Sequence, residues 1–306
     1  MRILVTGGAG FIGSHVVEYF QGKAGVRVLD NLRSGYLHNL NGFTCEFIKG
    51  SILNRDVVRQ AMEGVDYVFH LAAMISVPES MQKPIECVEI NTAGTLMVLK
   101  EAARAQVKKL VFSSSAAIYG DNPTVPKVET MLPEPKSPYA ITKLDGEYYC
   151  AMFANEGRLP TACLRYFNVF GPRQDPKSQY AAAVPIFMER ALCKEPITIF
   201  GDGEQTRDFI YVKDVVAANA YFAVNPAFMG VYNIGYGHRV TVNDLARMIL
   251  KSANSDAPIQ YATERAGDIK HSLAAIDKLR GAGFIPAGSL EGGLQMTVRS
   301  WPNGMK

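Results

Sequence analysis

The sequence lacks the features that mark several classes of protein. Its 306 residues include only five cysteines, and no two of them have the C-x-x-C spacing of metal sites. No apolar run approaches the roughly 20 residues of a membrane span, and the net charge of +3 comes without a basic run. We therefore expect no metal, no membrane and no nucleic acid, and reduced thiols in a cytoplasmic protein. The first expected strand begins at residue 2, which leaves no room for a signal peptide.

A glycine-rich run, Thr6–Gly13, lies between a short apolar run and a helix-like stretch. Gly7 permits a tight turn, Gly10 lets the backbone approach a pyrophosphate, and Gly13 lets the helix pack closely on the strand. The N–H groups at the start of that helix then face the phosphates. Asp30 ends the next apolar run, where a carboxylate can bind a ribose diol and repel a 2′-phosphate. The pattern predicts a site for NAD.

The first half of the chain alternates short apolar runs with helical patterns. Strands are expected at 2–6, 26–30, 45–49, 66–72 and 109–114, and helices at 11–22, 54–63, 84–105 and 137–156. This alternation predicts an α/β fold, a Rossmann-type doubly wound parallel sheet over residues 1–165, with some later segments interleaved. Ligands of such sheets bind outside the carboxyl ends of the strands, where Gly7, Asp30, Ala72 and Ser115 are expected.

The pattern becomes less regular after about residue 160. We expect a strand at 161–167, a loop at 171–182, helices at 183–194, 213–224 and 241–253, and short strands at 197–200, 209–211, 231–234 and 258–262. Residues 166–306 should therefore form mainly a smaller, mixed α/β substrate lobe. A small-molecule cleft is expected between this lobe and the sheet.

Tyr139 and Lys143 are candidates for proton transfer. Ser137 and Pro138 suit the cap and first turn of a helix, and the i, i+4 spacing places both side chains on one helix face. A nearby ammonium should lower the pKa of the tyrosine, which would make it a general base for an alcohol. Ser115, at the end of a strand, is expected to hydrogen-bond the substrate oxygen, although such serines also bond local backbone.

With these motifs, the sequence resembles the extended short-chain dehydrogenase/reductase family, and within it the nucleotide-sugar 4-epimerases of the UDP-galactose (UDP-glucose) 4-epimerase type. The resemblance covers the chain from Thr6 to about Arg280. It is carried by the order and spacing of Thr6–Gly13, Asp30–Leu32, His70–Ala73, Asn91–Thr95, Ser113–Gly120, Tyr139 with Lys143, Arg165–Pro172, Gly201–Gly203 with Thr206–Phe209, and Arg265–Asp268.

The resemblance implies a role for each matching position. Tyr139 would be the base, Lys143 would tune it and hold the nicotinamide ribose, and Ser115 would share the substrate hydroxyl. NAD would be held by Gly7, Gly10, Phe11, Ile12, Asp30, Asn31, Ser34, Gly35, Ser51, Ile52, Leu71, Ala72, Ala73, Asn91, Ser113, Tyr139, Lys143 and Tyr166. The UDP-sugar would be held by Ser115, Tyr139, Asn168, Val184, Thr198, Ile199, Phe200, Arg207, Arg265, Asp268 and Ser272.

The implied mechanism is an internal redox cycle. Tyr139 would remove the proton of the sugar 4-hydroxyl while NAD accepts the 4-hydride. The 4-keto sugar would then turn over, and hydride would return to its other face. NAD would be regenerated in place, and UDP-glucose and UDP-galactose would be interconverted.

Related enzymes perform other reactions with this fold. The sugar 4,6-dehydratases carry an Asp-Glu pair directly after the strand-end hydroxyl, where this chain has Ala116 and Ala117. The Glu of the UDP-glucuronate decarboxylases is missing as well. A nucleotide-sugar dehydratase or reductase, and a non-catalytic NAD-binding regulator, remain as alternatives.

Two residues depart from the family pattern near the expected cofactor site. Ser51 stands where the family usually has an Asp that meets the adenine. Arg33 follows Asp30 closely, and a cation there can serve a 2′-phosphate, although Asp30 should dominate and favour NAD.

The resemblance also bears on sugar range and assembly. The family position four residues beyond Asp268 lines the pocket near the sugar C2 substituent, and here it is the small Ser272. We therefore hypothesise that UDP-GlcNAc and UDP-GalNAc are accepted as well. The stretch 84–105 and the helix carrying Tyr139 have apolar faces that relatives pair in a homodimer, although such faces can also be buried within one subunit.

Overall fold

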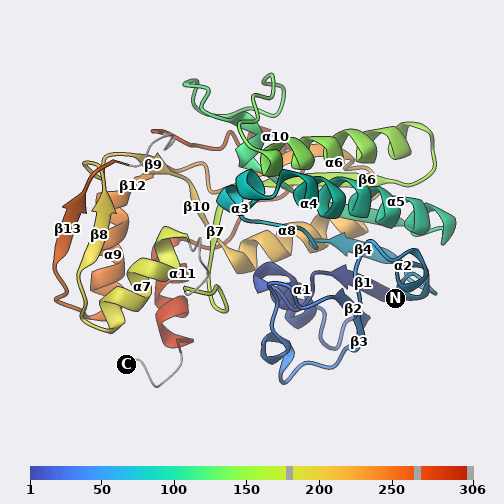
Figure 1. Cartoon of the computed structure of the whole chain (residues 1–306), viewed down its shortest axis with the longest axis horizontal. Helices are drawn as coiled ribbons and strands as arrows, with labels where there is room; N and C mark the ends of the chain where they lie inside the picture. The colour runs from blue at the N-terminus through green and yellow to red at the C-terminus, as the bar shows by residue number, and fades with distance from the viewer. Residues whose placement is uncertain (177–181, 265–269, 302–306) are drawn as a thin grey trace.

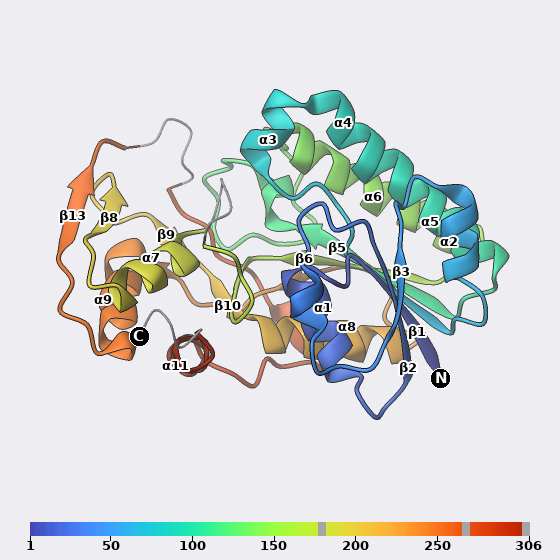
Figure 2. The ribbon, with the colours of Figure 1, turned by 60° about the horizontal axis from the view of Figure 1, so that its bottom comes forward.

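The computed structural model describes residues 1–176, 182–264 and 270–301. A large parallel sheet with helices on both faces occupies one side of the molecule, and a smaller group of helices and short strands occupies the other (Figures 1 and 2). No helix in the described ranges is long and apolar enough to cross a membrane.

The main sheet has seven strands in the order β11-β6-β5-β4-β1-β2-β3, and all neighbours are parallel. Its strands are β1 (Arg2–Thr6), β2 (Gly25–Asp30), β3 (Glu46–Lys49), β4 (Tyr67–His70), β5 (Lys109–Ser115), β6 (Thr161–Tyr166) and β11 (Gly230–Ile234). The predicted doubly wound fold is confirmed. Because β11 joins this sheet, residues beyond 165 contribute to it, and the division of the chain at residue 165 stays a prediction.

Helices cover both faces of the main sheet. One face carries α2 (Arg55–Ala61), α4 (Pro84–Val88), α5 (Gly94–Arg104) and α6 (Pro138–Asn155), and the other carries α1 (Phe11–Tyr19) and α8 (Val212–Val224) (Figure 2). Alternate side chains of β1 serve the two cores: Leu4 packs with the first group, whereas Ile3 and Val5 pack with the second. The six helices named here differ little from their expected ranges, except that a π-helical turn, Glu89–Ala93, divides the stretch 84–105.

The smaller part combines short two-stranded sheets with helices. It contains β7 (Asn168–Phe170), β8 (Ile197–Phe200), β9 (Thr206–Arg207), β10 (Phe209–Tyr211), β12 (Val240–Thr241), β13 (Ile259–Ala262), α7 (Ala183–Leu192), α9 (Val242–Ala253), α10 (Asp277–Gly281) and α11 (Leu290–Arg299). Strand β8 pairs with β13, β7 with β10, and β9 with β12. The sequence reading missed β7, β9, β12, α10 and α11, as well as α3 (Val77–Gln82).

Most of the missed elements are too short to show a periodic pattern, but α11 is a different case. Its glycines, Gly292 and Gly293, argue against a helix by propensity. The structure uses Gly293 for close packing, since a Cβ there would lie 2.7 Å from the ring of Phe170. Tertiary contact therefore outweighs local preference in this helix.

Candidate functional site

A cavity of about 1080 Å³ lies at the carboxyl ends of the sheet strands and extends to the smaller part. Most of the residues expected at a cofactor site line it: Gly7, Gly10, Phe11, Ile12, Asp30, Asn31, Ser34, Gly35, Ser51, Ile52, Leu71, Ala72, Ala73, Ser113, Tyr139, Lys143 and Tyr166. Of the residues expected to hold substrate, Ser115, Asn168, Val184, Thr198, Phe200 and Arg207 also line it. The cavity therefore joins the two expected sites.

The glycine run forms a tight turn between β1 and α1. Gly7 has a φ of +72°, and its N–H donates to the carbonyl oxygen of Leu29. A Cβ at Gly13 would lie 2.2 Å from the Gly7 carbonyl oxygen, so only glycine allows the helix to approach the turn this closely. Gly10 precedes α1 without a capping side chain. The first turn of α1 thus presents its backbone N–H groups toward the cavity, as an anion site requires.

Asp30 lies at the carboxyl end of β2, on the same cavity wall. Its carboxylate accepts hydrogen bonds from the N–H groups of Ala9, at 2.9 Å, and Leu32, at 2.8 Å. Burial raises the pKa of this carboxyl, and the two backbone hydrogen bonds oppose that rise. These contacts fix the carboxylate beside the glycine turn, where a ribose diol would meet it. The glycine turn, the α1 N-terminus and Asp30 together fit a dinucleotide.

The three candidate catalytic side chains converge at the other end of the sheet edge. Ser137 caps α6 by accepting from the N–H of Ala140, so Tyr139 and Lys143 lie in the first turns of the helix. The Lys143 ammonium donates to the carbonyl oxygen of Ser113 at 2.7 Å and lies 5.7 Å from the centre of the Tyr139 ring. Ser115 interacts with the Tyr139 hydroxyl, and its Oγ accepts from the N–H of Ala117.

The electrostatic balance at Tyr139 differs from the sequence expectation. Burial raises the pKa of the Tyr139 hydroxyl, and the hydrogen bond with Ser115 only partly opposes this rise. Burial also lowers the pKa of the Lys143 ammonium to about 8. The expectation of a lowered tyrosine pKa is therefore wrong for the protein groups alone, because burial is the largest influence and only the hydrogen bond with Ser115 opposes it.

A buried ion pair supports the strand end that carries the serines. The Glu147 carboxylate, one helical turn beyond Lys143, accepts from Ser114 Oγ and from two nitrogens of Arg165 at 2.8 and 2.7 Å. Both charged side chains are only 4% exposed. This pair connects β5, β6 and α6 behind the cavity, so the serines and the catalytic helix keep a common position.

Three expected site residues do not line the cavity. The buried amide of Asn91 accepts from the N–H of Met74 at 2.7 Å and donates to Thr142 Oγ1 at 3.0 Å, so it connects a cavity wall to α6. Ile199 is fully buried in the core because its neighbours on β8 face the other way. Ser272 lies next to the site, where its N–H donates to Thr206. Arg265 and Asp268 lie outside the described residues.

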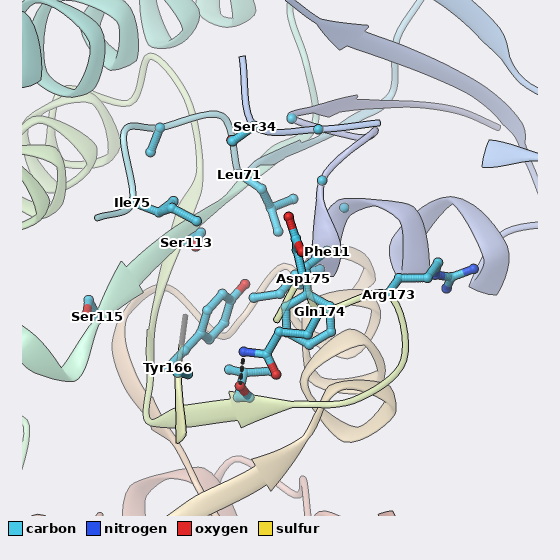
Figure 3. Close-up of a pocket in the computed structure, with 18 of the residues that line it drawn as sticks. Phe11, Ser34, Leu71, Ile75, Ser113, Ser115, Tyr166, Arg173, Gln174 and Asp175 are labelled. Atoms are coloured by element: carbon cyan, nitrogen blue, oxygen red, sulfur yellow. Dashed lines mark hydrogen bonds between the residues drawn. The ribbon is translucent and has the colours of Figure 1, made fainter. Parts of the chain in front are cut away.

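The segment after β7 contributes residues that the sequence reading did not identify. Arg173, Gln174 and Asp175 line the cavity opposite Ser113 and Ser115 of β5 (Figure 3). The Tyr36 hydroxyl, from the segment after β2, donates to the Asp175 carboxylate at 2.9 Å. Polar residues in an expected loop gave no signal for this contact, which joins segments far apart in the sequence. Among the described residues, no group of three or more His, Cys, Asp or Glu could hold a metal ion.

Comparison with known proteins agrees with this geometry. The model of the NAD-dependent epimerase/dehydratase family matches residues 3–235. A putative UDP-glucose 4-epimerase of Methanocaldococcus jannaschii is 36% identical over 98% of each chain. The UDP-glucose 4-epimerase of Thermotoga maritima, solved with UDP-glucose, is 42% identical over the full length of both chains, with a TM-score of 0.94.

A second solved structure is similar to the same degree. It is the UDP-N-acetylglucosamine 4-epimerase of Methanobrevibacter ruminantium M1 in complex with UDP-N-acetylmuramic acid, at 41% identity and a TM-score of 0.94. The match covers 98% of this chain and 97% of that one. With its glycine turn, Asp30 and the Ser115, Tyr139 and Lys143 group, the chain belongs to the NAD-dependent epimerase/dehydratase family, and NAD is its cofactor.

Proposed function

We propose that this protein is a UDP-hexose 4-epimerase that interconverts UDP-glucose and UDP-galactose. The observation that carries the proposal is the position of the Ser115, Tyr139 and Lys143 group within one cavity. The residues expected to hold NAD line this same cavity, as do Thr198, Phe200 and Arg207 of the smaller part. A sugar carbon held between the two would meet the cofactor and the proton-transferring hydroxyl together.

The side chains divide the chemistry at the sugar 4-position. The ionised Tyr139 oxygen would accept the proton of the sugar 4-hydroxyl, the resulting phenol would return it when hydride comes back, and Ser115 would hydrogen-bond the same 4-oxygen. Lys143, fixed by the Ser113 carbonyl, holds its ammonium beside the tyrosine. Bound NAD supplies the hydride acceptor and donor and a positive charge that offsets the raised pKa of Tyr139. The buried setting keeps water from the oxidised sugar.

We propose that residues 166–306, which form most of the smaller part, bind the UDP portion of the substrate. Arg207 can donate to the diphosphate, while Thr198 and Phe200 would lie against the uracil, with Asn168 and Val184 beside them. Arg265 and Asp268 are proposed to complete this grip. A firm hold on UDP with few contacts to the sugar lets the ring turn over between the two hydride transfers.

Elimination of water from the sugar is disfavoured by the residues after Ser115. Ala116 and Ala117 form the start of a 3₁₀ turn, Ala116–Tyr119, at the position where a dehydratase needs acidic groups. Neither side chain can donate or accept a proton. Epimerisation needs no such group, since the proton and hydride removed from the 4-position return to it.

Acceptance of the N-acetylated sugars UDP-GlcNAc and UDP-GalNAc is also proposed. Ser272 has a small side chain, and its backbone N–H donates to Thr206 at 3.0 Å, next to the cavity-lining Arg207. A similar protein acts on UDP-N-acetylglucosamine. Space at Ser272 is the feature of this chain that would admit the N-acetyl group.

A homodimer is proposed through the helices beside the sheet. Met81, Ile85 and Val88 on α3 and α4, and Ile141, Tyr148 and Met152 on α6, are exposed apolar side chains. Helices α3 and α4 pack against α6, so these side chains lie on neighbouring surfaces (Figure 1). Exposed apolar residues concentrated on adjoining helices favour association with a second copy.

Replacement of the proposed base tests the function directly. Tyr139→Phe should lower the turnover of UDP-galactose to UDP-glucose by about 10²-fold or more, because proton transfer at the 4-oxygen is lost. Chromatography of the UDP-sugars, without added NADH, measures the conversion. Tyr19→Phe, at the exposed end of α1 and outside the cavity lining, is the matched control and should remain active. Near-full activity of Tyr139→Phe with an unchanged melting temperature would contradict the mechanism.

A larger residue at position 272 tests the sugar range. Ser272→Tyr should lower kcat/KM for UDP-GlcNAc by at least about tenfold while changing that for UDP-glucose much less, because the clash involves only the N-acetyl group. Ser272→Ala should leave both values nearly unchanged. Equal losses for both sugars in Ser272→Tyr would count against a selective role for this position.

Insertion of a charge on the exposed helix face tests the homodimer. Ile85 is 75% exposed, so Ile85→Lys should preserve the fold and convert the dimer to a monomer in light scattering coupled to size exclusion. Tyr261→Lys, on β13 at the far end of the molecule, is the control and should remain dimeric (Figure 1). A monomeric parent protein, or a dimer that survives Ile85→Lys, would refute this interface.

A further inference from the structure

Arg33 carries a positive charge beside the expected ribose site. It follows Asp30 by three residues, in the segment after β2, and its side chain lines the cavity. A guanidinium next to the ribose-binding carboxylate is the usual ligand of the 2′-phosphate of NADP, which it can bind with two parallel hydrogen bonds. Asp30, which disfavours a 2′-phosphate, and Arg33, which favours one, therefore lie close together in the chain.

Two glutamates, Glu79 and Glu86, form ion pairs with this guanidinium. Arg33 Nη1 donates to Glu86 Oε1 at 2.5 Å, and Arg33 Nη2 donates to Glu79 Oε1 at 2.8 Å. The arginine and Glu79 side chains are each 28% exposed, and Glu86 is 41% exposed. Both terminal nitrogens, which form the fork that would grip a phosphate, already face a carboxylate.

The backbone on both sides holds the cluster in place. The N–H of Arg33 donates to the Asn31 side chain, and Leu32 adopts a φ of +61° with its N–H on Asp30. On the other side, Ser76 caps α3 by accepting from the N–H of Glu79. The Ser80 hydroxyl accepts from the N–H of Tyr139, which joins α3 to the catalytic helix. The backbone segments that carry Arg33, Glu79 and Glu86 are therefore each held by hydrogen bonds, which keeps the three side chains in contact.

We propose that Glu79 and Glu86 determine cofactor choice by withholding Arg33 from a 2′-phosphate. Each carboxylate satisfies one nitrogen of the fork, and the two together present negative charge where the additional phosphate of NADP would have to bind. Asp30 discriminates through the ribose hydroxyls, whereas the two glutamates remove the compensating cation. The Lys83 ammonium lies 3.6 Å from the Glu79 carboxylate and 3.9 Å from the Glu86 carboxylate, and its side chain is 55% exposed. Both glutamates keep their hydrogen bonds to Arg33 beside it.

The proposal concerns the nucleotide and does not depend on which sugar is converted. It is tested by equilibrating the purified protein with equimolar NADH and NADPH, removing free nucleotide, and measuring the bound ratio by chromatography. The bound NADPH to NADH ratio of the Glu79→Gln, Glu86→Gln double variant should rise about tenfold, the order expected for one charge-assisted contact with phosphate. Loss of epimerase activity leaves this readout unchanged, so failure of the proposed function is distinguished from failure of this inference.

The decisive comparison is the same double variant with Arg33→Gln added, which should return the ratio to that of the parent protein. Glu89→Gln, at an exposed acidic position on the same helical stretch, is the matched control and should change nothing. The single Glu86→Gln variant should show a smaller rise and guards against a folding defect of the double variant. An unchanged ratio in the double variant, or a rise that persists without Arg33, would overturn the proposal.

Discussion

The site depends on the parallel pairing of β1, β4, β5 and β6. Thr6 of β1 lies opposite His70 of β4, and His70 lies opposite Phe112 of β5. Their chain directions agree, so the glycine turn, the Leu71–Ala73 segment and the serines of β5 all emerge at one edge. Parallel pairing alone therefore brings the cavity wall expected to hold the nucleotide and the serine expected to act in catalysis to the same edge of the sheet. A shift of one residue in the register of β5 against its neighbours would turn Ser113 and Ser115 to the opposite face of the sheet.

Burial sets the chemical state of the groups placed at this edge. The same desolvation raises the pKa of Tyr139 and lowers that of Lys143 to about 8, so Tyr139 is neutral near pH 7 while Lys143 is still mostly an ammonium. A positive charge near the tyrosine therefore has a large effect on its proton affinity, since the surroundings screen it weakly. Burial in the same interior opposes the charge of Arg165, but the hydrogen bonds and the charge of Glu147 raise the pKa of its guanidinium. The protein thus combines a rigid charged support with a reactive pair that responds to the cofactor.

The sequence was most informative where function requires a fixed chemical pattern. The glycine run, Asp30, and the Tyr139 and Lys143 spacing predicted the sheet edge and its contents because short-range geometry determines them. Asn91 and Ile199 do not line the cavity, since a motif match does not reveal which way a side chain points. The links between Glu147 and Arg165 and between Tyr36 and Asp175 join segments far apart in the chain, and only the folded structure brings them together. Arg33 was noticed as a cation, but its glutamate partners depend on how α3 and α4 pack.

Transfer of the hydrogen at the sugar 4-position is the most direct measure of an internal redox cycle. UDP-galactose carrying deuterium at C4 should give UDP-glucose that retains deuterium at C4, with none released to water, because the hydrogen leaves and returns within one closed cavity. Mass spectrometry and NMR of the product locate the label. Loss of deuterium from C4, or release of reduced nucleotide in proportion to product, would contradict the cycle.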